Sequence, residues 1–186
     1  MMEENIFFQI DKIKSIGKNV IIGKTVRIRY PELVEIGDNV IIDDFTYIST
    51  ALKIHSNVHI SAGCKIIGGK KAFVEMKEFS TLAPNVVLSA GTDDYLSGIA
   101  TPLVPMSYKA NARIGSIIIN KHCIIGAGSV VLPDVVLEEG SGLGALSLAK
   151  RSLHEYTLYA GIPARQIKKR NKSEIQFLEN KYRNEK

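Results

Sequence analysis

The sequence predicts an all-β fold, a parallel β-helix in which the chain winds around three flat walls. The first observation is a strict period of six, in which branched aliphatic residues recur at Ile119, Ile125, Val131, Leu137 and Leu143. Four residues after each of them comes a small or β-branched residue, at Cys123, Ser129, Val135, Ser141 and Ser147. An amphipathic helix needs a period near 3.6 and a simple strand needs a period of two. Hexapeptide repeats are instead typical of β-helices.

The second observation is the length of one complete coil. The step from Ile36 to Ile54 is eighteen residues, or three sixes, which predicts three walls and a triangular cross-section. Ile and Val pack well on pleated surfaces, and the Gly, Asn and Asp residues that follow them suit tight corners. A single coil cannot bury its own inner face, so stacked coils must supply the core.

The elements follow in order as one domain of 186 residues. We expect residues 1–15 to cap the open end of the stack, because terminal repeats need a cover. Residues 16–148 form the β-helix, and residues 149–186 form a tail with a C-terminal helix. Ser173 is the predicted N-cap of that helix, with Ile175, Leu178 and Tyr182 on one face.

One long interruption breaks the repeat between residues 89 and 118. It contains Pro102 and Pro105 and has little periodicity. Loops of this length without secondary structure of their own are usually functional or disordered. We interpret the segment as an arm that leaves the prism and lies over a neighbouring surface.

Composition narrows the possible partners and the compartment. The formal charge is +5, concentrated in the tail, but no nucleic-acid motif or aromatic platform accompanies the charge.

The N-terminus does not resemble a signal peptide, and no apolar run approaches the roughly 20 residues of a membrane span. Cys64 and Cys123 fall on inward positions and are expected to be reduced core thiols. No spacing of His, Asp or Glu predicts a metal site. We therefore expect a cytoplasmic protein.

The repeat together with AGIPARQIKKR, which begins at Ala160, resembles the hexapeptide-repeat sugar acyltransferases over roughly residues 16–170. This family includes galactoside and maltose O-acetyltransferases and nucleotide-amino-sugar N-acyltransferases. The resemblance implies a left-handed coil, a homotrimer, and acetyl-CoA bound in a groove between adjacent prisms. The left hand is not implied by the repeat, because β–crossover–β connections are normally right-handed.

The same resemblance implies a donor site. Ala127 and Ala145 match the family positions that meet the thin pantetheine chain. The basic family positions near the ADP phosphates are matched by Lys150, Arg151, Arg165 and Lys168. Charge-assisted contacts from such groups to phosphate are strong. A solvated charged face is the other interpretation of these cations.

On the acceptor side the chain departs from part of the family. Where the galactoside and maltose enzymes carry a histidine base, this chain has Asp93, followed by Asp94. A hydroxyl needs its proton removed during attack, which suits histidine, whereas an amine can be oriented by a carboxylate. The acid pair favours N-acylation of a nucleotide-linked 4-amino or 3-amino deoxysugar for surface polysaccharide synthesis. The opposing interpretation is an Asp loop turn bonded to local backbone.

The histidines leave two alternatives open. His59 should face outward from a wall, and a histidine in a similar segment lies near acyl-CoA in several relatives. His122 is expected at the surface, His55 at a corner, and His154 in tail packing. With His59 or His122 as base the protein would be an O-acetyltransferase that acts on a glycan hydroxyl. A non-catalytic β-helix scaffold is the remaining alternative, and it leaves the basic tail unexplained.

Overall fold

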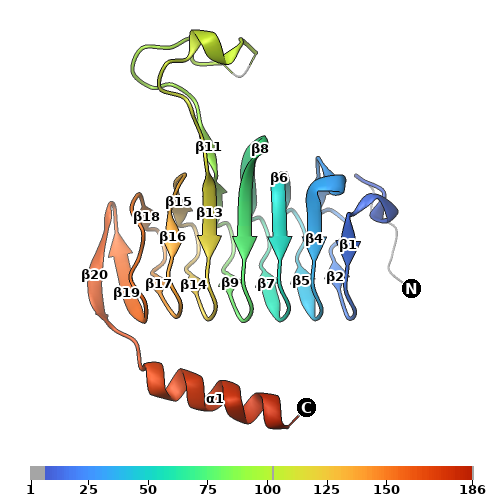
Figure 1. Ribbon diagram of the computed structural model, residues 1–186, viewed down its shortest axis with the longest axis vertical. Helices are drawn as coiled ribbons and strands as arrows, with labels where there is room; N and C mark the ends of the chain where they lie inside the picture. Colours follow the sequence, from blue (N-terminus) through green and yellow to red (C-terminus); the bar gives the residue numbers. More distant parts are fainter. Residues whose placement is uncertain (1–6, 102, 186) are drawn as a thin grey trace.

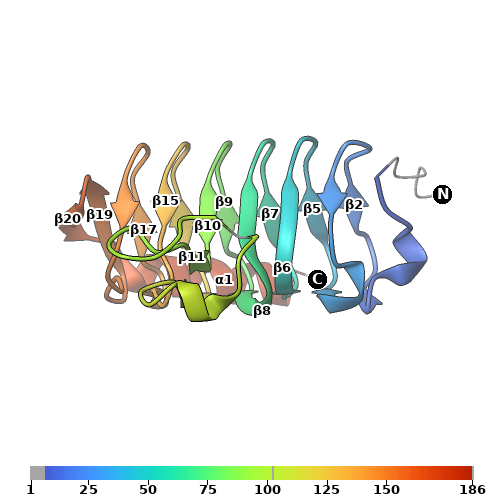
Figure 2. The same ribbon diagram turned by 90° about the horizontal axis from the view of Figure 1, so that it is seen from above.

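The computed structural model describes residues 7–101 and 103–185 as a left-handed parallel β-helix of about seven turns, followed by one α-helix (Figure 1). Seen from above, the coils form a single row (Figure 2). The predicted fold class is confirmed, including the long mid-coil loop and the C-terminal helix.

Three walls of parallel strands enclose the core. The first wall contains the second halves of β6 (Tyr47–Ile54) and β8 (Lys65–Met76), together with β1 (Ser15–Ile16), β4 (Val34–Ile36), β13 (Ser116–Ile119) and β16 (Val136–Leu137). The second wall consists of β2 (Ile21–Ile22), β5 (Val40–Ile42), β7 (Val58–Ile60), β9 (Thr81–Leu82), β14 (Ile124–Ile125), β17 (Gly142–Leu143) and β19 (Thr157–Gly161). The third wall contains the first halves of β6 and β8, together with β3 (Arg27–Ile28), β10 (Val87–Ser89), β15 (Val130–Val131) and β18 (Leu148–Ala149).

The repeat works as predicted, because every sixth aliphatic side chain from Ile36 to Ile66 and from Ile119 to Leu143 is buried. In the second of these runs the residues four positions later, from Cys123 to Ser147, are buried as well. At about 25 cal/mol per Å² of apolar surface, this continuous column supplies the main driving force for folding. At the N-terminal end, η1 (Ile10–Lys12) precedes buried Ile13, and Phe8 and Ile10 pack against the core. The rest of the predicted cap, residues 1–6, lies outside the described residues.

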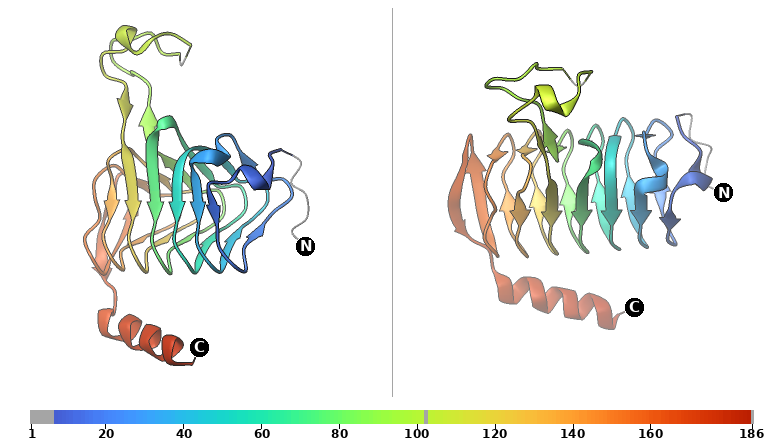
Figure 3. Two further views of the ribbon diagram at one scale, coloured as in Figure 1. Left: turned by 45° about the vertical axis from the view of Figure 1, so that its right-hand side comes forward. Right: turned by 45° about the horizontal axis from the view of Figure 1, so that its top comes forward.

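The long loop leaves the prism at the edge between the third and first walls, which we call the loop edge (Figure 3). Its stem is an antiparallel pair, β11 (Gly91–Thr92) with β12 (Arg113–Ile114), and η3 (Met106–Tyr108) lies in its outer part. Ile117 already belongs to the buried first wall, so the excursion is a few residues shorter at its end than predicted. The same edge carries η2 (Pro31–Leu33) nearer the N-terminus.

The C-terminal end is closed by β20 (Ala164–Lys169), which pairs antiparallel with β19. The helix α1 (Lys172–Asn184) then turns back along the stack (Figure 1). The predicted N-cap was wrong by two residues: the Asn171 side chain, not Ser173, accepts the hydrogen bond from the Glu174 N–H. Asn and Ser are comparable caps, so sequence alone separates them poorly.

The helix docks on the edge between the first and second walls through Glu179. This carboxylate accepts from Lys121 Nζ at 2.6 Å, His122 Nε2 at 2.8 Å and Arg183 Nε at 2.6 Å. His122 also stacks on Phe79, with ring centroids 5.3 Å apart. The expectation that His122 lies at the surface was therefore wrong, because α1 leaves its side chain only 11% exposed.

This anchor predicts an acid-sensitive helix. Burial opposes ionisation of Glu179, yet hydrogen bonds from Lys121, Arg183 and His122 lower its pKa to about 2. Because the folded pKa lies below the ordinary value, this contribution is full above about pH 4.5 and is lost as the pH falls towards 2. We expect the protection factors of α1 amides, which compare observed with intrinsic exchange rates at each pH, to fall from pH 4.5 to 2.5, before the prism unfolds. A Glu179→Gln variant should lack that dependence, and identical profiles for the two proteins would contradict the assignment.

Candidate active site

On the second wall, His59 and Asp43 form an exposed hydrogen-bonded pair. His59 lies in the middle of β7, where side chains alternate, so it points away from the core. Asp43 directly follows β5, and its Oδ2 lies 2.8 Å from His59 Nε2. The two side chains are 45% and 43% exposed. An imidazole that is held by a carboxylate and open to solvent can accept a proton from a substrate.

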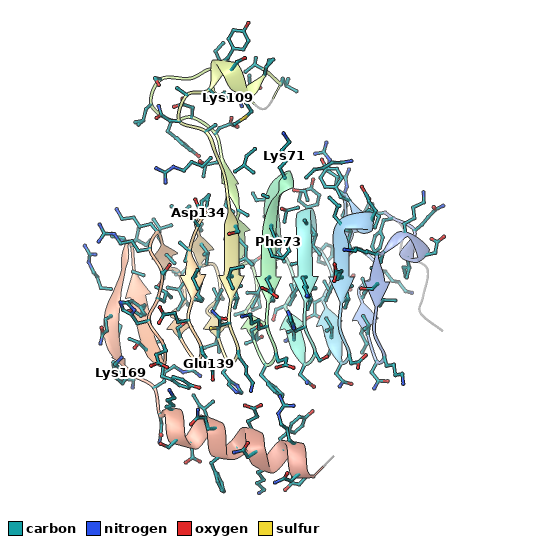
Figure 4. The ribbon with its side chains drawn as sticks, viewed as in Figure 1. Lys71, Phe73, Lys109, Asp134, Glu139 and Lys169 are labelled. Atoms are coloured by element: carbon teal, nitrogen blue, oxygen red, sulfur yellow. The ribbon has the colours of Figure 1, made fainter. Side chains whose placement is uncertain are left out.

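Asp93 occupies a different position, in the loop just after β11. Its carboxylate pairs with Lys109 Nζ, whose side chain is almost completely buried. Lys109 lies in the outer part of the loop (Figure 4). Asp93 keeps about a third of its side chain exposed, beside an open pocket of about 350 Å³ lined by Thr92, Tyr95, Asn111 and Arg113 among others. The pair leaves Asp93 able to accept a further hydrogen bond from a ligand in that pocket.

Asp94 turns inward and organises the loop. Its Oδ1 accepts from the backbone N–H groups of Leu96 and Ser97 at 2.9 and 3.0 Å, and Oδ2 accepts from the N–H of Asn111 at 2.8 Å. These bonds, led by the one from Asn111, hold the pKa of Asp94 well below its usual range. A Cβ at Gly98 would lie 2.6 Å from Asp94 Oδ2, so the loop needs glycine there. The geometry matches the alternative interpretation, a loop turn built on an Asp side chain.

A basic pocket of about 190 Å³ lies at the C-terminal end of the prism. It brings together three of the four predicted phosphate ligands: Lys150 and Arg151, which directly follow β18, and Arg165 on β20. Lys168 lies further along β20, opposite Leu158, outside the residues that line this pocket. His154 also lines the pocket and is 73% exposed, so the expectation that it packs into the tail was wrong.

Ala127 and Ala145 stack in successive coils at the edge between the second and third walls. The N–H of Leu146 donates to the Ala127 carbonyl at 2.9 Å, and both alanines are exposed. A Cβ at Gly126 would lie 2.4 Å from the Ala145 nitrogen, so glycine at this position lets the two coils stack closely. The small side chains of Ala127 and Ala145 leave room for a narrow chain bearing amides, beside the exposed side chain of Leu146.

Neither cysteine is a candidate nucleophile. Burial raises the pKa of both Cys64 and Cys123 to about 11. The thiolate is the reactive form, so both behave as core side chains.

Among residues 7–101 and 103–185, no three His, Cys, Asp or Glu side chains converge on a metal-sized site. No helix in the described part of the chain is long and apolar enough to cross a membrane.

Within one chain the predicted site residues form separate groups. His59 lies on the second wall, whereas Asp93 and Asp94 lie in the loop that leaves between the third and first walls. Sequence reasoning missed Asp43 and Lys109. Asp43 could have been found, since its coil stacks directly beneath that of His59, with Ile41 opposite His59. Lys109 could not, because the loop has no repeat to align it with Asp93.

Known proteins resemble the chain, although no protein-family model matches it. The dTDP-4-amino-4,6-dideoxy-D-glucose acyltransferase of Escherichia coli is 37% identical over 169 residues, covering 88% of this chain and 86% of that protein. A variant of AntD, an N-acyltransferase from Bacillus cereus, was solved with dTDP-4-amino-4,6-dideoxyglucose and coenzyme A. It is 36% identical with a TM-score of 0.90, covering 99% and 100% of the two chains. A maltose O-acetyltransferase from Clostridium difficile 630 is 18% identical, with a TM-score of 0.56 over 87% of this chain and 72% of that one, and shares the fold.

The prism, the mid-coil loop and the basic terminal pocket therefore define an enzyme of the β-helix acyltransferase class. Within this class, the family is identified by the sequence identity to these relatives, which extends over nearly the whole length of the chain. The chain belongs to the nucleotide-amino-sugar N-acyltransferase family that includes the E. coli acyltransferase and AntD.

Proposed function

We propose that this protein transfers an acyl group from an acyl-CoA, with acetyl-CoA as the expected donor, to the amino group of a dTDP-linked 4-amino-4,6-dideoxyhexose. The observation that carries the proposal is the 36% identity and near-complete overlap with AntD, whose structure contains such a sugar nucleotide and coenzyme A. The acylated sugar would serve surface polysaccharide synthesis. A cytoplasmic location agrees with the two buried, unpaired thiols.

Lys150, Arg151 and Arg165 would hold the donor phosphates in the basic pocket. The pantetheine chain would run along the edge of Ala127 and Ala145, towards the coils that carry the loop. Exposed backbone N–H groups would then polarise the thioester carbonyl as negative charge develops on its oxygen. The acyl group passes directly to the amine: the C–N bond forms, the C–S bond breaks, and the CoA thiolate takes up a proton.

His59 is the proposed proton acceptor, with Asp43 as its positioning residue. The attacking amine must lose a proton, and His59 is exposed and held by a carboxylate at 2.8 Å. Asp93 would orient the amine from the loop, with its carboxylate fixed by Lys109. Asp94 would act through the loop conformation, since its oxygens already accept three backbone bonds.

A homotrimer would bring these groups together. His59 and Asp93 lie on different parts of one prism, so a complete site needs the loop of one copy over the second wall of another. Large apolar side chains project from the edge between the second and third walls: Phe45, Leu146 and Ile162 are 73%, 72% and 75% exposed. Ile21, Ile41 and Ile124 add exposed apolar surface on the second wall. We take these exposed apolar side chains as the candidate contact surface between copies.

The donor site predicts a charge-dependent affinity for CoA. In the Lys150→Gln, Arg151→Gln double variant we expect the Kd for CoA to rise about tenfold or more, because two charge-assisted phosphate contacts are lost. A thermal shift titration measures this, since a ligand that binds only the native state raises the melting temperature. Lys12→Gln, at the opposite end of the stack, is the control. No stabilisation of the native protein by millimolar CoA would reject the proposed function and leave the scaffold alternative.

The His59–Asp43 pair also supports the second candidate, O-acetylation of a glycan hydroxyl. A hydroxyl requires a base during attack, and this geometry provides one. The two candidates are separated by measuring thiol release with a dTDP-4-amino sugar and with its 4-hydroxy counterpart. Turnover with the hydroxyl sugar alone would establish the second candidate.

A further inference from the structure

A cluster of aromatic and basic side chains covers the third wall and the loop edge in the first coils. Arg27 Cζ lies 5.8 Å from the ring centroid of Tyr47, and Arg29 Cζ lies 5.5 Å from that of Tyr30. Lys70 Nζ lies 4.9 Å over the Tyr30 ring. Lys65, opposite Tyr47 in the register, extends the positive charge. Glu32, 3.7 Å from Lys70, offsets one of these charges.

The proposed transfer chemistry does not use this cluster. The acyl donor occupies the last coils, and the proposed acid–base groups lie on the second wall and in the loop. The core does not need the cluster either, because Arg27, Arg29, Lys65 and Lys70 are all exposed. Holding five long or aromatic side chains together at the surface costs conformational entropy, which suggests a ligand-binding role.

The cluster is placed on the same edge as the loop. Arg27, Tyr47, Lys65 and Val87 are successive partners across β3, β6, β8 and β10, and β10 runs directly into the loop stem. Neighbouring strands are about 4.8 Å apart, so Tyr47 lies roughly 10 Å from the strand that feeds the loop. Lys71, at the bend between the two halves of β8, lies on the same side of the prism as the loop (Figure 4). A diphosphate and a hexose together bridge a gap of this order.

The reaction proposed above requires two ligands that both carry phosphates. The loop edge offers cations on both sides of the loop: Lys150 and Arg151 towards the C-terminal end, and Arg27, Arg29 and Lys70 towards the N-terminal end. The two acyl-transfer partners would then approach the loop from opposite ends of the stack. This arrangement lets their reactive atoms meet at the loop without bringing the two sets of phosphates together.

We propose that Tyr30, Tyr47, Arg27, Arg29 and Lys70 form the site for the pyrimidine nucleoside diphosphate of the acceptor, an inference that rests on the proposed function. The tyrosine rings stack against the base, as aromatic side chains do with nucleobases. The planar guanidinium groups of Arg27 and Arg29 bind the diphosphate through paired N–H donors. The sugar then points along the third wall towards Asp93.

The test uses dTDP itself as the probe, in calorimetric titrations of the full-length protein. Arg29→Gln and Tyr47→Ala should each raise the Kd for dTDP about tenfold or more, whereas Tyr47→Phe should keep most of the affinity. The same variants should raise KM for the sugar nucleotide with little change in kcat, and the Kd for CoA should be unchanged. Lys18→Gln, an exposed lysine on another edge, is the matched control. Circular dichroism checks that each variant is folded.

The outcomes separate this inference from the proposed function. If native protein binds both CoA and dTDP and the variants lose only dTDP, the site is supported. If the variants bind dTDP as tightly as the native protein does, the site is wrong and the proposed function stands. If the native protein binds CoA but not dTDP, the nucleotide site and the nucleotide-linked acceptor are both wrong. If it binds neither ligand, acyl transfer itself is wrong.

Discussion

Replacing His59 by alanine is expected to lower kcat about 100-fold or more, within the range that general acid–base catalysis contributes. The imidazole is held by Asp43 at 2.8 Å and is open to an incoming amine. Asp43→Asn should cost less, about tenfold, because it disturbs the orientation and basicity of His59 without removing the ring. The measurement is thiol release from acetyl-CoA with a dTDP-4-amino sugar at saturating substrate, across a range of pH.

The chain offers a matched control for this prediction. His55 also pairs with a carboxylate, Glu75 at 2.7 Å, but on the first wall. His55→Ala should leave kcat within about threefold of the native value, because general acid–base catalysis requires contact with the reacting groups. If His59→Ala is as active as His55→Ala, the proton acceptor lies elsewhere, and Asp93 becomes the candidate.

The second large effect is expected from Asp94→Ala. Losing the carboxylate leaves the backbone N–H groups of Leu96, Ser97 and Asn111 without their acceptors, so the loop should lose its conformation. We expect kcat/KM to fall about 100-fold, because catalytic groups must be held in position to act. Amide hydrogen exchange at these three residues should accelerate, while the affinity for CoA and the melting temperature of the prism change little.

Asp38→Ala is the control, since Asp38 also accepts a backbone N–H, that of Lys18, but on an edge away from the loop. Unchanged exchange in the loop of Asp94→Ala, together with lost activity, would instead assign Asp94 a direct contact with substrate. The pKa of Asp94 is lowered, so its contribution to loop order is full above its ordinary pKa and falls only in stronger acid. Activity that declines between pH 8 and 6 should therefore depend on groups other than Asp94.

The prism was predictable because its packing repeats. Ile60, Ile66 and Leu137 are buried where the period of six places them, since each inward side chain meets an equivalent residue one coil away. The loop was predictable only as an interruption. Whether Asp94 points inward or Asp93 pairs with Lys109 depends on contacts between residues that share no period. The docking of α1 over His122 was missed for the same reason, because Glu179 and His122 are 57 residues apart.

The antiparallel pairing of β20 with β19 also affects how the molecule behaves in concentrated solution. The last coil of a parallel stack has backbone N–H and C=O groups without partners. These groups could form hydrogen bonds with another molecule and join the two end to end. Here the outermost strand reverses direction and carries Arg165, Lys168 and Lys169. Charged side chains on an outermost strand oppose its pairing with another chain, so end-to-end filament formation is disfavoured.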